Sequence, residues 1–133
     1  MLIHQSAEDY LESILILRER NGRVRSIDIV NELQFTKPSV SVAMKKLREN
    51  GYILTDRDGY ITLTEKGQTV AARIYERHKV LTDLLIAIGV DGETAAADAC
   101  KIEHTLSDET FARIKAFSEK YREDCRSDIG GSL

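Results

Sequence analysis

Residues 26–50 read Ser-Ile-Asp-Ile-Val-Asn-Glu-Leu-Gln-Phe-Thr-Lys-Pro-Ser-Val-Ser-Val-Ala-Met-Lys-Lys-Leu-Arg-Glu-Asn. Apolar residues recur at helical spacing on both sides of Gln34-Phe35, which predicts two short helices joined by a tight turn. Ser26 and Thr36 are expected to cap these helices, and Pro38 falls in the first turn of the second one, where its missing N–H is tolerated. The spacing is typical of a helix-turn-helix.

The second of these helices has two chemically different faces. Val40, Met44 and Leu47 form the face expected to point inward, and no acidic residue precedes Glu49 on the other face. Short side chains let a helix enter the major groove of DNA while lysines reach phosphates. An ordinary amphipathic surface helix is the alternative, but the pattern favours DNA binding. The predicted DNA-binding residues of this motif are Ser26, Thr36, Lys37, Pro38, Ser39, Ser41, Val42, Lys45 and Lys46.

A β-hairpin is predicted directly after the helix-turn-helix. Residues 52–55 and 60–63 are rich in strand-forming residues and enclose Asp56-Arg57-Asp58-Gly59. A hairpin in this place forms the wing of a winged helix-turn-helix. We expect Arg57 at its tip to contact the DNA backbone or minor groove, although two aspartates flank it.

The rest of the chain is predicted to be helical. Helices are expected from Ser6 to about Asn21, from Thr64 to about Ile88, from Asp91 through residue 104, and from Ser107 to about Tyr121. The fold class is therefore mainly α with a small β-hairpin. We expect a winged helix-turn-helix domain at 1–70, a helical metal-binding and dimerisation domain at 71–123, and a flexible tail at 124–133.

Cys100-Lys101-Ile102-Glu103-His104 holds three potential metal ligands. Steps of three and four along one helix would bring its thiolate, carboxylate and imidazole together. Such a set suits Fe(II), Mn(II), Zn(II) or Co(II). A solvated helix face would explain this pentad equally well if it stood alone. Further donors within predicted helices complete a candidate set of Asp9, Glu12, His78, Cys100, Glu103 and His104.

Composition restricts the class of protein. The 133 residues carry a net charge of −3, but residues 22–66 hold 8 Lys or Arg against 6 Asp or Glu, which suggests a slightly basic module joined to an acidic one. No apolar run approaches the roughly 20 residues that span a bilayer, and no secretion signal is evident, so we expect a cytoplasmic protein without membrane attachment. Two cysteines are too few for a disulfide framework.

Apolar residues also remain on the outer faces of the last predicted helices. Faces of this kind suggest pairing with a second copy of the chain. The predicted dimer interface consists of Leu84, Leu85, Ile88, Phe111, Ile114 and Phe117.

Several motifs together resemble the diphtheria toxin repressor family of metal-dependent transcriptional regulators. They are Glu8-Asp9-Tyr10-Leu11-Glu12, Thr36-Lys37-Pro38-Ser39-Val40-Ser41, Leu63-Thr64-Glu65-Lys66-Gly67, Arg77-His78 and Cys100-Lys101-Ile102-Glu103-His104-Thr105-Leu106-Ser107. The chain looks most similar to the short manganese transport regulators. The resemblance implies a homodimer in which metal binding positions two recognition helices on a palindromic operator, with metal-uptake genes as the targets.

The resemblance also implies a hybrid ligand set. Asp9, Glu12, His78, Glu103 and His104 match ligands of the manganese branch, in which a glutamate stands where this chain has a cysteine. That cysteine matches the iron-responsive branch. Sulfur favours later ions, so we expect Fe(II), with Mn(II) close behind and Zn(II) or Co(II) binding possible in vitro.

Two other functions compete with the metalloregulator. A winged-helix regulator could sense a thiol oxidant or a small organic ligand through Cys100. An enzyme is not expected, because the sequence lacks a glycine-rich phosphate loop and a nucleophile elbow, and every candidate side chain falls in a predicted helix.

Overall fold

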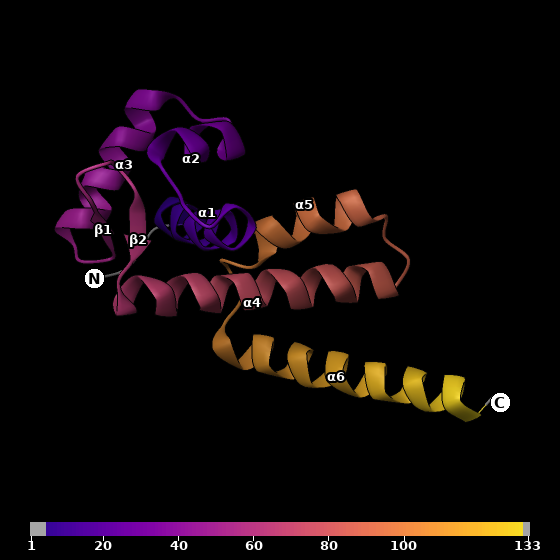
Figure 1. Cartoon of the computed structure of the whole chain (residues 1–133). Coiled ribbons are helices and arrows are strands. Elements are labelled where there is room, and N and C mark those ends of the chain that lie inside the picture. The colour runs from indigo at the N-terminus through magenta and orange to yellow at the C-terminus, as the bar shows by residue number, and fades with distance from the viewer. Residues whose placement is uncertain (1–4, 132–133) are drawn as a thin grey trace. The chain divides into compact units, whose positions relative to one another are not determined.

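The computed structural model describes residues 5–131, and it confirms the predicted mainly helical fold with one hairpin (Figure 1). The elements are α1 (Gln5–Asn21), α2 (Ser26–Leu33), α3 (Lys37–Glu49), β1 (Ile53–Thr55), β2 (Ile61–Leu63), α4 (Glu65–Ala87), α5 (Gly92–Ile102) and α6 (Asp108–Gly131). Two compact units divide inside α4, between Tyr75 and Glu76. In the described part of the chain, no helix has both the length and the apolar character needed to cross a membrane.

The first unit contains the helix-turn-helix. Gln34, after α2, has the left-handed backbone (φ 57°) that turns the chain, and the Thr36 hydroxyl caps α3 by accepting a hydrogen bond from the Ser39 N–H at 3.3 Å. Ser26 is not a cap as predicted but the first residue of α2. Arg25 holds the cap position instead, and its N–H donates to Asp28 Oδ2 at 2.8 Å. The carboxylate three residues into the helix therefore orders its start.

The hairpin is the predicted wing. β1 and β2 pair in antiparallel fashion with Leu54 opposite Thr62. At the tip, Asp56 Oδ1 accepts hydrogen bonds from the N–H groups of Asp58 and Tyr60, each at 2.9 Å. Asp56 therefore shapes the loop, because its short side chain accepts hydrogen bonds from two backbone N–H groups of the turn.

One hydrophobic core unites the elements of the first unit. α1 contributes the largest share, and the helix-turn-helix and the hairpin pack around it, as the apolar periodicity predicted. Its buried members are Tyr10, Leu11, Ile14, Leu15, Leu17, Val24, Ile29, Val40, Met44, Leu47, Tyr52, Ile53, Ile61 and Ala71.

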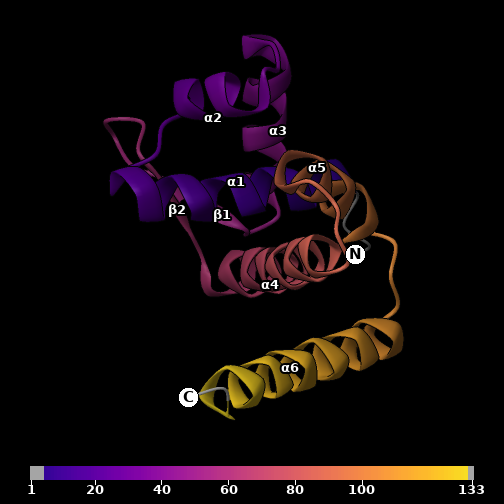
Figure 2. The ribbon, with the colours of Figure 1, turned by 90° about the vertical axis from the view of Figure 1, so that its right-hand side faces the viewer.

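The second unit consists of the end of α4 together with α5 and α6. Lys115 Nζ lies 2.6 Å from Glu76 Oε1, and Arg122 pairs with Asp83. The second ion pair lies seven residues further along both helices than the first, so α4 and α6 run in the same direction over about two turns. Figure 2 shows the two helices side by side. α6 extends to Gly131, beyond the tail boundary expected at residue 124, and residues 132–133 lie outside the described part.

Candidate metal centre and DNA-binding surface

Three of the residues predicted to bind metal, Cys100, Glu103 and His104, lie where α5 ends. Cys100 is exposed in the last turn, which finishes at Ile102, and the Glu103 N–H still donates to the Ala99 carbonyl at 2.9 Å. The chain then leaves the helix, because the next turn is closed by the Thr105 N–H donating to the Ile102 carbonyl at 3.0 Å. The predicted continuous helical face is therefore wrong for His104, which lies in this turn.

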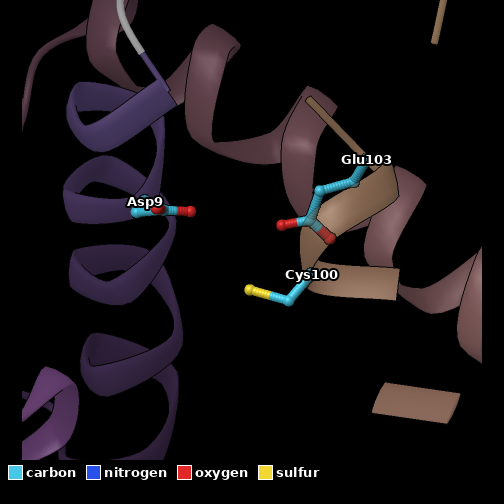
Figure 3. Close-up of side chains that lie close together, drawn as sticks. All are labelled: Asp9, Cys100 and Glu103. Carbon is cyan, nitrogen blue, oxygen red and sulfur yellow. The ribbon is translucent and has the colours of Figure 1, made fainter. Parts of the chain in front are cut away.

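Glu103 is the centre of the site within the second unit. Its side chain is 0% exposed, its Oε2 lies 2.9 Å from Nδ1 of His78 on α4, and its Oε1 lies 3.4 Å from Nε2 of His104. The structure thus brings three predicted ligands together. Figure 3 shows that the side chains of Cys100 and Glu103 point to the same side of the α5 end.

Arg77 holds the backbone around this carboxylate in place. Its side chain is 2% exposed, and its guanidinium donates to the Glu103 carbonyl at 3.2 Å, to the Leu106 carbonyl at 2.6 Å and to Asp108 Oδ1 at 2.6 Å. The same group lies over the ring of Phe111, at 5.1 Å from its centroid. We did not predict this role from the sequence, because the distance of Arg77 from residues 103–108 along the chain hides the contact.

The donors of the second unit fit a divalent metal ion. Within the described residues, Glu103 Oε1 accepts no hydrogen bond although it is buried. Burying an ionised carboxylate is costly unless a positive charge or several hydrogen bonds compensate for it. Two imidazoles and a thiol around this carboxylate are ligand types that first-row divalent ions accept.

Asp9 and Glu12 lie on α1 in the first unit. They are three residues apart and therefore occupy one helical face; Glu12 is buried and Asp9 half-buried. Figure 3 shows the Asp9 carboxylate extending away from the α1 axis. Burial and the negative charge of Asp9 raise the pKa of the neighbouring Tyr10 above its ordinary value.

The predicted DNA-binding residues of the helix-turn-helix are all exposed. Val42 stands out because it is apolar and 55% exposed on the outer face of α3. An open hollow of about 420 Å³ joins the start of α2 to α3 and is lined by Ser26, Ile27, Val30, Lys37 and Ser41. On the wing, Arg57 is exposed, and the Asp56 carboxylate is engaged by the turn.

The predicted dimer residues fall into two groups. Ile88 and Phe117 are 70% and 61% exposed, and Ile86 and Tyr121 nearby are also exposed. Leu84, Leu85, Phe111 and Ile114 are half-buried within the chain.

Comparison with known proteins decides the family. The iron-dependent repressor N-terminal DNA-binding domain matches residues 2–61, and the iron-dependent repressor metal-binding and dimerisation domain matches residues 64–129. The chain belongs to the iron-dependent repressor family. The resemblance to the diphtheria toxin repressor family, in its short two-domain branch, is thereby confirmed. This iron-dependent repressor family member is a metal-dependent, DNA-binding transcriptional regulator.

Full-length relatives are consistent with this assignment. An HTH-type transcriptional regulator from Methanocaldococcus jannaschii is 40% identical over 121 residues, covering 90% of this chain and 97% of the relative. The HTH-type transcriptional regulator MntR from Bacillus subtilis is 35% identical over 119 residues, covering 90% and 84%. Both relatives are named as transcriptional regulators.

Solved structures show the same relationship. The manganese regulator SloR is 30% identical with a TM-score of 0.73, covering 88% of this chain and 54% of that one. A manganese-dependent transcriptional repressor in complex with manganese is 28% identical with a TM-score of 0.78, covering 85% and 52%. This repressor family member therefore spans about half the length of these solved chains.

Proposed function

We propose that this repressor uses Fe(II) or Mn(II) as its corepressor, held by Asp9, Glu12, His78, Cys100, Glu103 and His104. The observation that carries the proposal is Glu103, whose buried carboxylate lies between two imidazoles and has one oxygen without a hydrogen bond among the described residues. A bound cation would supply the charge that this burial requires.

The donor chemistry supports Fe(II) slightly over Mn(II). Three carboxylates and two imidazoles suit either ion, and the sulfur of Cys100 favours the later one. The relatives named above include the manganese regulator SloR and a manganese-dependent repressor. A further one, the manganese-activated repressor ScaR, has been solved with Zn²⁺, at 26% identity and a TM-score of 0.68. Those names describe the relatives; for this chain the ion is an inference from its own donors.

The proposed ligands come from both compact units. Metal binding would therefore control the repressor by linking these units. Metal bonds hold ligand atoms at about 2.0–2.3 Å. Such bonds from Asp9 and Glu12 on α1 and from the α4 and α5 donors require one particular arrangement of the two units. An effector acts by its differential affinity for two arrangements, so metal would favour the DNA-binding one.

We further propose a homodimer that binds a palindromic operator at metal-uptake genes in the cytoplasm. A two-fold dimer presents two recognition helices to successive major grooves, about 34 Å apart. The exposed Ile88 and Phe117 offer an apolar surface for the partner, together with Leu84, Leu85, Phe111 and Ile114. The outer face of α3 and Arg57 of the wing would contact the DNA.

The test is an anaerobic titration of the apo-protein with Fe(II), Mn(II) and Zn(II), followed by retention of duplexes from a random pool at fixed salt. Metal-dependent enrichment of a palindrome supports the proposal, and the ion acting at the lowest free concentration is the best corepressor. Equal retention with chelator and with every metal contradicts it.

A thiol-sensing regulator is the second candidate, because Cys100 is exposed and therefore accessible to an oxidant. It predicts DNA binding that survives chelator and is lost with peroxide. Loss with chelator, and no effect of peroxide on the metal-loaded protein, would exclude it.

A further inference from the structure

Two arginines share one aromatic ring beside the wing. Arg23 and Arg25 flank the buried Val24, whose carbonyl accepts a hydrogen bond from the Ile61 N–H at 2.7 Å. Their guanidinium carbons lie 5.0 and 4.3 Å from the centroid of the Tyr60 ring. Both distances are within the range of a cation–π interaction. We refer to Arg23, Arg25 and Tyr60 as the arginine pair and its ring.

The backbone around this cluster is held in place from several sides. The Arg25 N–H donates to Asp28 Oδ2 at 2.8 Å, and the Tyr60 N–H donates to Asp56 Oδ1 at 2.9 Å. Val24 is anchored in the core at 0% exposure. The backbone that carries both arginines is therefore ordered before any partner arrives, which lowers the entropy cost of binding one.

The positive charge of the pair is not neutralised within the described part of the chain. Neither guanidinium forms an ion pair there, whereas Arg20 nearby pairs with Glu32 at 3.1 Å. Two like charges near one ring repel each other, and a bound anion close to them would relieve that repulsion. Arg25 is followed in the sequence by Ser26, which lines the hollow between α2 and α3.

We propose that the arginine pair and its ring bind phosphates of the DNA backbone beside the wing, with Tyr60 as the positioning residue. This inference rests on the proposed DNA-binding function and adds a surface outside the recognition helix and the wing tip. Guanidinium groups suit phosphate oxygens because their N–H donors match them in pairs. Phosphate contacts fix register without reading sequence, so the surface should act equally on all duplexes.

The salt dependence of DNA binding reports how many phosphates the protein contacts, and so it tests the proposed role of the arginine pair. The slope of log K against log salt is about −0.9 for each phosphate neutralised on duplex DNA. Arg23→Ala/Arg25→Ala in the metal-loaded protein should therefore make the slope less negative by roughly 2 for each bound subunit, or roughly 4 for the proposed dimer, and weaken binding similarly on the selected palindrome and on unrelated duplexes. Fluorescence anisotropy over roughly 50–200 mM salt gives both quantities. Arg18→Ala, which removes an exposed arginine on α1 that takes no part in the ring contacts, is the matched control and should leave the slope nearly unchanged.

Tyr60 variants separate positioning from charge. Tyr60→Phe keeps the ring and should retain wild-type affinity and slope, whereas Tyr60→Leu should weaken binding by about two- to fivefold because the guanidinium groups lose their platform.

Two results would overturn the inference. One is a wild-type salt slope in the double arginine variant, even if its unfolding midpoint falls, because the arginines would then be structural only. The other is equal DNA affinity of the Phe and Leu variants, which would remove the role of the ring. Failure of the proposed function would look different, since the wild-type protein itself would then show no metal-dependent DNA binding.

Discussion

His78 Nδ1 lies 2.9 Å from Oε2 of Glu103, a carboxylate that is fully buried. A residue of α4 is thus joined to the residue that caps α5, through side chains that are both of metal-ligand type. The Glu103 carboxylate is therefore buried with only part of its charge compensated by the described residues, because its Oε1 accepts no hydrogen bond from them.

This relationship predicts that Glu103→Gln weakens metal affinity but does not destabilise the metal-free protein. Loss of a carboxylate ligand should weaken metal binding by at least the roughly 10–100-fold seen when outer-sphere partners are removed. The free energy of unfolding without metal should stay equal or rise, because a neutral amide is less costly to bury. Anaerobic calorimetry and urea unfolding measure the two quantities. Glu109→Gln, an exposed carboxylate on α6, is the control; wild-type metal affinity in Glu103→Gln would contradict the site.

Arg77 should be a major source of stability in the second unit. Arg77→Met leaves the carbonyls of Glu103 and Leu106 without their buried donor, and we expect the free energy of unfolding to fall by about 2–4 kcal/mol. Asp108→Asn should cost less than about 1 kcal/mol because the Asp108 side chain is 81% exposed. Urea unfolding without metal compares both with the exposed Arg113→Met. Similar losses in all three variants would show that the two carbonyl contacts are unimportant.

Gly67 should tolerate no side chain. A Cβ there would lie 2.0 Å from the Tyr52 carbonyl oxygen, a backbone atom that already accepts a hydrogen bond from the Thr64 N–H. We expect Gly67→Ala to lower the free energy of unfolding by about 2 kcal/mol or more, since the hairpin and the start of α4 must separate. Gly92→Ala, at the first residue of α5 with open space around it, should be neutral or stabilising by up to about 1 kcal/mol. Equal behaviour of the two variants in thermal unfolding would refute the close approach.

Cys100 should set the preference between ions. Replacing its sulfur with the carboxylate of Cys100→Glu should lower the ratio of Fe(II) to Mn(II) affinity, because an oxygen donor favours Mn(II) more than a thiolate does. The change is accessible to anaerobic competition calorimetry, with Glu109→Gln again as the surface control. An unchanged ratio would mean that sulfur is not a ligand that selects the ion.

The sequence by itself determined the order and type of the elements, because these depend on local signals. Thr36 with Pro38, the apolar period of α3 and the alternation of the hairpin each act over a few residues. The family was likewise readable from short motifs. Ser26 was misjudged because the cap depends on which of two adjacent residues leaves the helix, and Asp28 decides this by reaching back to the Arg25 N–H.

The tertiary structure alone decided the relations between distant residues. His104 lies in the turn that follows α5. Arg77 reaches the carbonyls of residues 103 and 106, and two arginines approach the ring of Tyr60, the residue just before β2. Periodicity assigns a residue to a face but carries no information on which distant backbone or ring that face meets. Those contacts depend on how the elements pack, and packing is a property of the whole core.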